Sequence, residues 1–274
     1  MSLLDLAEKA TAADGVAPFN ETSLFALQDG ARARVQVIQT SADGELVGAA
    51  YAVGDAPVEI VVHPDHRRTG IGRRILDELV ADGEDSFWAH GDLPAAQALA
   101  ASAGLAVARE LLVLQLTFDG PPTPERTPDG VTLRAFEPAD AEPLIAVNAR
   151  AFAHHPEQGA MDRADFDRRT SSDWFDPEGL FIAEKDGKVI GFHWTKVEDS
   201  AGDQPSGEVY VVGIDPDAQG GGLGTALTAR GLRHMYEKGL STVDLYVEGD
   251  NAPALKVYRN LGFKDWKKDT LYTR

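Results

Sequence analysis

The chain of 274 residues has 43% hydrophobic and 26% charged side chains, a globular composition long enough for two domains. Its formal net charge of −18 argues against a nucleic-acid partner, because such binding depends on lysines and arginines that neutralise phosphates. We find no apolar run near the roughly 20 residues of a membrane span, no secretory signal and no cysteine. We therefore expect a cytoplasmic protein without a membrane partner, a disulfide or a thiolate nucleophile.

The first half alternates between helical and extended patterns bounded by turn residues. A short helix is expected to begin at Glu21, capped by Asn20. In chain order, the patterns predict helices within 1–30, a hairpin at 32–53, a strand, turn and helix at 58–80, a strand at 86–90, a helix at 94–104 and a strand at 111–118.

A proline-rich stretch separates this half from the next. Residues 119–130 contain four prolines, which is typical of a stiff linker between folded regions. We therefore predict a first domain at 1–119, a linker at 120–130 and a second domain at 131–274.

The second half repeats the order of the first. Its patterns predict a strand at 131–136, helices within 138–172, a hairpin at 180–197, a strand at 208–214, a helix at 223–238, a strand at 241–250, a helix at 252–262 and a strand at 263–273.

Two motifs recur at matching places in the two halves. HPDHRRTGIG at 63–72 corresponds to DPDAQGGGLG at 215–224, and residues 92–104 correspond to 250–262. Since strands and helices alternate within each half, the repeat predicts two tandem α/β domains of one fold, each with a mixed sheet.

The glycine-rich turn at 219–224 lies between a predicted strand and a predicted helix. Backbone N–H groups at a helix N-terminus favour anions, so the turn could hold a phosphate. On its own, such a turn could equally be a tight connection.

Two side chains near this turn could exchange protons with a substrate. Glu208 opens the strand before the turn and could act as a base, although a solvated edge residue fits the same pattern. Tyr258 on the last predicted helix could act as an acid, although an aromatic core residue fits equally well. Their counterparts in the first half are Ala56 and Ala100, so we predict that the first domain is catalytically silent.

The spacing Gln-x-x-Gly-x-Gly after a valine-rich strand resembles the pyrophosphate loop of the GCN5-related N-acetyltransferases. The chain is further similar to the mycothiol synthase family, tandem acetyltransferases of actinobacteria. The segments that carry this resemblance are FWAHG (87–91), AFAHHPEQG (151–159), WFDPEGL (174–180), GFHWTKV (191–197), GEVYVVGIDPDAQ (207–219) and LYVEGDN (245–251).

The resemblance implies an activity and its partners. Acetyl-CoA would acetylate the cysteinyl amine of 1D-myo-inositol 2-(L-cysteinylamino)-2-deoxy-α-D-glucopyranoside, with no metal required. Glu208 would accept the amine proton, and Tyr258 would protonate the leaving thiolate. The acceptor would contact Glu21, Glu157, Lys196, Glu208 and Tyr246.

The resemblance also implies two sites for acetyl-CoA. In the second half the site would comprise Val212, Gly213, Ile214, Gln219, Gly220, Gly221, Gly222, Leu223, Gly224, Thr225, Asn251, Ala252, Pro253, Ala254, Leu255 and Lys256. In the first half it would comprise Ile60, Val61, Val62, Arg68, Thr69, Gly70, Ile71, Gly72 and Arg73.

Two other functions remain open from the residues alone. One is acetylation of another small amine, such as an aminoglycoside or an amino acid, and the other is non-catalytic sensing of acyl-CoA. Retention of Glu208 and Tyr258 in the second half argues against the sensor. We expect a monomer, since two fused domains can bury a shared interface.

One departure from the family pattern predicts a measurable difference. Gly220 and Gly221 stand where the family usually has two basic residues, so two cations beside the pyrophosphate are lost. We expect weaker and more salt-tolerant coenzyme A binding than in a relative that has this pair. Isothermal titration over a range of ionic strength tests this, and a steep loss of affinity with salt would contradict it.

Overall fold

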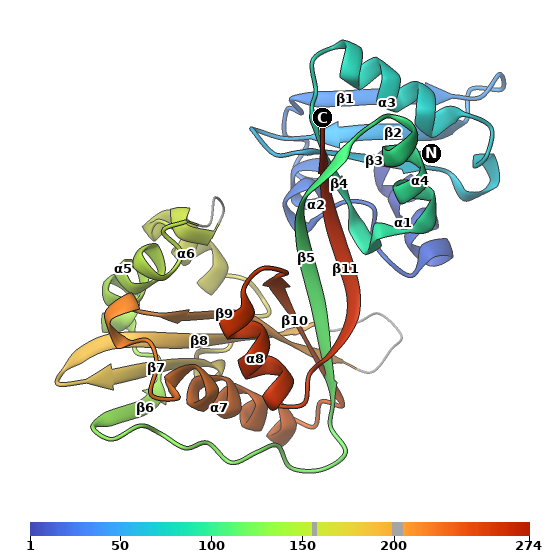
Figure 1. Ribbon diagram of the computed structural model, residues 1–274. Helices are drawn as coiled ribbons and strands as arrows, with labels where there is room; N and C mark the ends of the chain where they lie inside the picture. Colours follow the sequence, from blue (N-terminus) through green and yellow to red (C-terminus); the bar gives the residue numbers. More distant parts are fainter. Residues whose placement is uncertain (155–157, 199–204) are drawn as a thin grey trace. The chain divides into compact units, whose positions relative to one another are not determined.

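The computed structural model describes residues 1–154, 158–198 and 205–274, which form two compact units (Figure 1). The first unit comprises Met1–Leu112, Glu248–Asp250 and Lys267–Arg274, and the second comprises Val113–Val247 and Asn251–Trp266. No helix in these described ranges is long and apolar enough to cross a bilayer.

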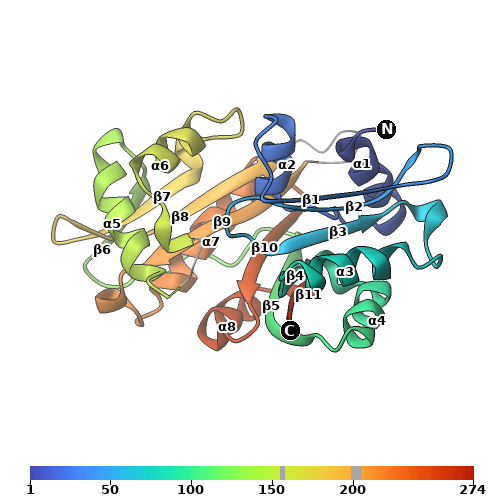
Figure 2. The same ribbon diagram turned by 90° about the horizontal axis from the view of Figure 1, so that it is seen from above.

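The first unit is a sheet with helices on both faces (Figure 2). Its strands run in the order β1-β2-β3-β4-β11, with β3 and β4 parallel and the other neighbours antiparallel. Their bounds are β1 (Val35–Thr40), β2 (Leu46–Ala52), β3 (Val58–Val62), β4 (Ser86–Ala89) and β11 (Lys264–Thr273). The helices are α1 (Leu3–Asp14), α2 (Glu21–Gln28), α3 (Ile71–Ala81) and α4 (Pro94–Ser102).

Two apolar clusters hold these layers together. Leu6 and Ala10 of α1 pack with Tyr51 on one face, whereas Ile75 and Leu79 of α3 pack with residues such as Phe87 on the other. The predicted cap of α2 is confirmed, since the Asn20 side chain accepts a hydrogen bond from the backbone N–H of Ser23.

The end of the chain returns to the first unit. Residues 270–273 of β11 pair antiparallel with residues 86–89 of β4. The long strand β5 (Ala106–Thr117) is likewise shared, because its residues to Leu112 belong to the first unit and the rest to the second.

The second unit has the same layered plan. Its strands run in the order β5-β10-β9-β8-β7-β6, in which β9 and β10 are parallel, while β6, β7, β8 and β9 form antiparallel neighbours. Their bounds are β6 (Val131–Ala135), β7 (Leu180–Lys185), β8 (Lys188–Glu198), β9 (Ser206–Ile214) and β10 (Thr242–Glu248). The helices are α5 (Ala141–Ala151), α6 (Arg163–Thr170), α7 (Leu223–Glu237) and α8 (Ala252–Asn260).

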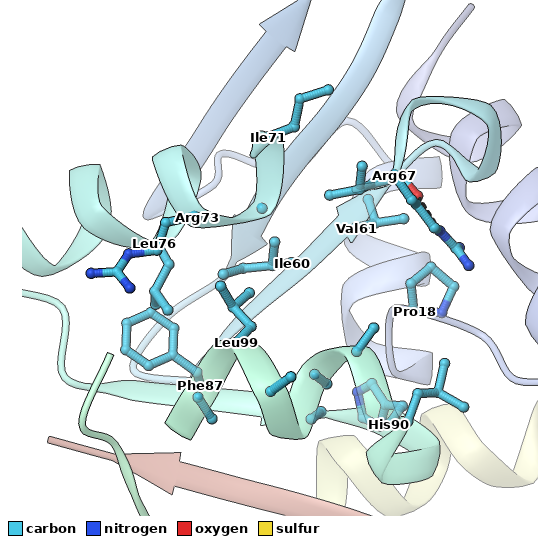
Figure 3. A pocket seen from close by; sticks show the side chains of 18 of the residues that line it. Pro18, Ile60, Val61, Arg67, Ile71, Arg73, Leu76, Phe87, His90 and Leu99 are labelled. Atoms are coloured by element: carbon cyan, nitrogen blue, oxygen red, sulfur yellow. Dashed lines mark hydrogen bonds between the residues drawn. The ribbon is translucent and has the colours of Figure 1, made fainter. Parts of the chain in front are cut away.

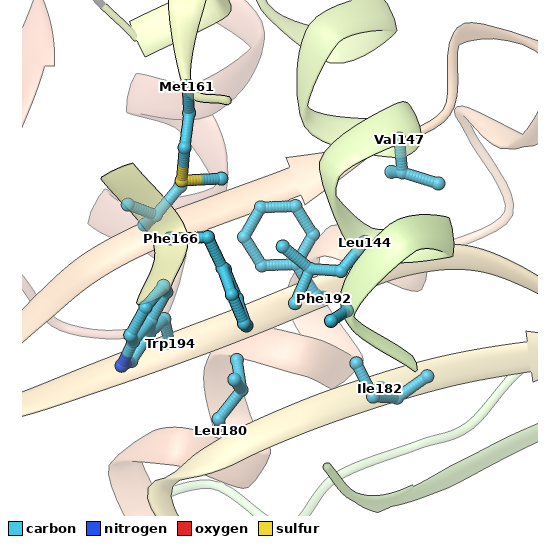
Figure 4. Packing of buried hydrophobic residues seen from close by; sticks show 10 residues of the cluster. Leu144, Val147, Met161, Phe166, Leu180, Ile182, Phe192 and Trp194 are labelled. Carbon is cyan, nitrogen blue, oxygen red and sulfur yellow. The ribbon is translucent and has the colours of Figure 1, made fainter. Parts of the chain in front are cut away.

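An aromatic core fills the space between the sheet and α5 and α6. Trp194 and Phe192 of β8 are fully buried there and pack with Phe166 of α6 and Leu144 of α5 (Figure 4). Helix α7 covers the opposite face of β7, β8 and β9 (Figure 1). Both units therefore have the predicted mixed α/β architecture, and the tandem repeat is confirmed.

Candidate active site

The glycine-rich turn of the second unit joins β9 to α7. Its three successive glycines have positive φ angles of 91° at Gly220, 60° at Gly221 and 86° at Gly222, a conformation that side chains disfavour. Gly222 precedes the first turn of α7, and no side chain caps this helix start. The first N–H groups of α7 therefore fit an anionic group such as a pyrophosphate.

The corresponding turn of the first unit has nearly the same backbone. Gly70 precedes α3 with φ 85°, again without a side-chain cap, and Arg68 adopts φ 63° at the position that matches Gly220. An arginine thus occupies a left-handed position in this turn, whereas the φ of 91° at Gly220 lies further from the range that side chains adopt.

A β-bulge in β9 decides where Glu208 points. Trp194 of β8 pairs with Val211, but the next residue, Thr195, pairs with Val209, so the register shifts by one residue at Tyr210. On a regular strand, residues an even number apart point to the same face.

Two glycines show that the bulge changes this alternation. A Cβ on Gly207 would meet Met235 of α7, whereas a Cβ on Gly213 would meet Phe192 in the aromatic core. Since these glycines are six residues apart, the bulge between them switches the faces. Glu208, next to Gly207, therefore points to the side of the sheet covered by α5 and α6.

Lys196 lies directly opposite Glu208. The two residues are paired across β8 and β9, so their side chains share one face. Lys196 is only 6% exposed, whereas lysine side chains are mostly exposed in folded proteins. Tyr246 follows Leu245, which pairs with Val209 of β9, so the alternation places Tyr246 on the face of Glu208 as well. The structure therefore brings three of the predicted acceptor-site residues onto one face.

Helix α8 carries the predicted acid. Burial raises the pKa of Tyr258 from 10 to about 12, so the phenol is protonated at neutral pH and is a weaker acid than an exposed tyrosine. Asn251 caps α8, because its side chain accepts a hydrogen bond from the backbone N–H of Ala254. The asparagine therefore fixes the start of the helix that positions Tyr258.

The geometry of this face does not test the other two predicted acceptor residues. Glu157 lies outside the described residues. Glu21 is the exposed first residue of α2 and belongs to the first unit.

A cavity of about 480 Å³ lies within the first unit (Figure 3). It is bounded by β3, the glycine turn, β4 and α4, and Leu93 and Ala100 line it where the second unit has Asn251 and Tyr258. The predicted first-half residues that line it are Ile60, Val61, Val62, Arg68, Gly70, Ile71, Gly72 and Arg73; Thr69 does not.

His90 on the wall of this cavity forms a buried charged cluster that sequence reasoning missed. Its Nε2 lies 2.6 Å from Glu59 Oε1, and its Nδ1 lies 2.9 Å from Asp269 Oδ2. Although burial alone would lower it, hydrogen bonds to Asp269 and Glu59 raise the pKa of His90 from 6.5 to about 9. The cluster joins β3, the turn that follows β4, and β11.

Comparison with known proteins shows which protein family the chain matches. The acetyltransferase (GNAT) family matches residues 148–263, and an acetyltransferase (GNAT) domain matches residues 32–104. A protein of Thermomonospora curvata named mycothiol acetyltransferase is 48% identical over 98% of this chain and 92% of its own. The relative of that name from Saccharomonospora viridis is 50% identical over 85% of this chain and 81% of its own.

The chain belongs to the mycothiol acetyltransferase family. The GNAT family match at 148–263 includes the face with Lys196 and Glu208 as well as Tyr258 on α8. The match at 32–104 includes β3, the first glycine turn and the cavity walls of α3 and α4.

Solved structures agree with the fold of this mycothiol acetyltransferase family member. A GCN5-related N-acetyltransferase from Sphaerobacter thermophilus covers 98% of this chain and 90% of its own, with a TM-score of 0.73 at 23% identity. A tandem GNAT protein from the clavulanic acid biosynthesis pathway covers 99% and 93%, with a TM-score of 0.66 at 21% identity. At these identities the likeness bears on the fold alone, and the predicted tandem fold is confirmed.

The His90 cluster predicts that the first unit loses stability at alkaline pH. A raised pKa means that the fold favours the protonated imidazole, so the contribution is complete below pH 6.5 and is lost as the pH rises through about 9. Its size is on the order of 3 kcal/mol. Calorimetric unfolding between pH 6 and 9.5 should show this decline, and His90→Gln should flatten it.

The half-buried His66 provides a matched control in the same unit. His66→Gln should leave the decline between pH 6.5 and 9 intact. A His90→Gln protein with the same pH dependence as the unaltered chain would contradict the assignment of the decline to His90.

Proposed function

We propose that this chain transfers the acetyl group of acetyl-CoA to the cysteinyl amine of 1D-myo-inositol 2-(L-cysteinylamino)-2-deoxy-α-D-glucopyranoside, giving mycothiol and coenzyme A. The observation that carries the proposal is identity of 48% with a mycothiol acetyltransferase over 98% of the chain. The bulge that turns Glu208 toward Lys196 supports an acceptor site on that face.

The second unit provides the groups that acetyl-CoA requires. Val212, Gly213 and Ile214 end β9, and residues 219–225 supply the uncapped start of α7 for the pyrophosphate. Residues 251–256, at the start of α8, are proposed to complete this acetyl-CoA site. When bound, acetyl-CoA supplies the activated acetyl group and the thiolate leaving group.

Glu208 is the proposed base. The acceptor amine is protonated at neutral pH and becomes a nucleophile only when it loses a proton. A carboxylate of Glu208 can accept that proton directly or through water. Lys196 beside it can donate hydrogen bonds to oxygen atoms of the acceptor.

Tyr258 is the proposed acid. Its Oη holds a proton at neutral pH, as the phenol of an ordinary tyrosine does, and burial raises its pKa further, to about 12. Proton donation from this oxygen toward the departing sulfur would complete the transfer.

The acceptor is cationic and rich in hydroxyl groups, which suits a site with several carboxylates. Glu21, Glu157 and Glu208 can accept hydrogen bonds from its ammonium and hydroxyl groups, and Tyr246 adds a phenol. The roles of Glu21, Glu157 and Tyr246 rest on the resemblance to the family.

The first unit is proposed to bind acetyl-CoA without catalysing transfer. Its cavity includes the glycine turn and Arg68, but Ala56 and Ala100 stand in place of the base and the acid. We further propose a cytoplasmic monomer that uses neither a metal nor a nucleic acid.

The proposal predicts a marked acceptor preference. Acetyl-CoA turnover, followed by thiol release, should be at least tenfold higher in kcat/KM with the cysteinyl-glucosaminyl-inositol acceptor than with aminoglycosides or free cysteine.

Lys196→Met should raise the acceptor KM while leaving acetyl-CoA binding unchanged.

Other outcomes of the same assay discriminate between functions. Activity on an aminoglycoside alone would preserve the acetyltransferase chemistry and overturn the substrate. Tight acetyl-CoA binding without turnover of any amine would favour a non-catalytic sensor.

A further inference from the structure

The buried ammonium of Lys196 lies against two aromatic rings. Its Nζ is 5.3 Å from the ring centroid of Trp174 and 5.6 Å from that of Tyr210. These distances are within the range in which a cation is attracted to the face of an aromatic ring. The rings therefore restrain a long side chain that otherwise has several rotatable bonds.

The two rings are themselves held in place. Their centroids are 5.0 Å apart in an edge-to-face arrangement. Trp194 packs against both, with centroids 5.9 Å from Trp174 and 5.7 Å from Tyr210. Since Trp194 is fully buried in the aromatic core (Figure 4), the rings rest on a rigid support.

Arg169 of α6 adds a polar restraint. Its Nη1 donates a hydrogen bond of 2.7 Å to Oη of Tyr210, and its guanidinium carbon lies 5.6 Å from the same ring. Asp165, one turn earlier on α6, pairs with Arg169 at 2.9 Å and orients it. The bulge residue Tyr210 is thus fixed from its phenol as well as from its ring.

We propose that Trp174 and Tyr210, the latter oriented by Arg169, are positioning residues that hold the Lys196 ammonium beside Glu208 for acceptor recognition. Two stretches that are far apart in sequence meet here: residues 165–174, which run from α6 into the segment before β7, and the bulge in β9. The arrangement places a restrained cation opposite the proposed base. The inference rests on the proposed function, because it assigns Lys196 to the acceptor.

The inference predicts a selective effect on the acceptor. Trp174→Leu removes one ring face and should raise the acceptor KM about fivefold to tenfold. The KM for acetyl-CoA should change less than twofold, because the ring restrains a group on the acceptor side. Trp174→Phe retains a ring and should restore most of the acceptor affinity, whereas Tyr210→Phe removes only the phenol and should raise the KM about twofold.

A control separates positioning from loss of core packing. Phe166 belongs to the same buried cluster and packs on Trp194 at 5.5 Å, whereas the Lys196 ammonium lies over the rings of Trp174 and Tyr210. Phe166→Leu should lower the melting temperature as much as Trp174→Leu does, without the selective rise in acceptor KM.

Two failures can be told apart. A wild-type chain that acetylates the acceptor, combined with an unchanged acceptor KM in Trp174→Leu, would overturn this inference alone. It would also be overturned if Trp174→Leu and Phe166→Leu each changed the acceptor KM and the acetyl-CoA KM by equal factors. A wild-type chain that acetylates no amine would overturn both the inference and the proposed function.

Discussion

The proposed site depends on a one-residue shift of register in the β8–β9 ladder. Tyr210 forms a bulge in β9, and without it Glu208 would point toward α7 and away from Lys196. The bulge also turns the Tyr210 ring toward Trp174 and Arg169. One shift of strand register therefore brings the proposed base, a restrained cation and its aromatic support to the same face.

The two units show how one fold can retain a binding turn and differ in chemistry. Both have a left-handed glycine before an uncapped helix, which suits an anion. They differ at the start of the preceding strand, because β3 begins at Val58 and leaves Ala56 outside it, whereas β9 begins at Ser206 and includes Glu208. The first unit instead carries the His90 cluster, which joins its strands.

The sequence predicted the features that depend on local pattern. Strand and helix order, the two glycine turns and the Asn20 cap follow from periodicity and turn residues, and the structure has them. The sequence pattern did not predict the bulge, because the run VYVVGI is compatible with the regular alternation of a strand. The pairing of β11 with β4 and the rings around Lys196 depend on contacts between distant segments, which periodicity does not encode.

The account requires Glu208 to be the group that accepts the amine proton. The most direct measurement is the pH dependence of kcat/KM for the cysteinyl-glucosaminyl-inositol acceptor, in the unaltered chain and in Glu208→Gln. We expect an acidic limb in the unaltered chain that disappears in the variant, together with a loss of about 100-fold or more in rate. A Glu208→Gln protein with near-normal turnover and the same acidic limb would contradict the account.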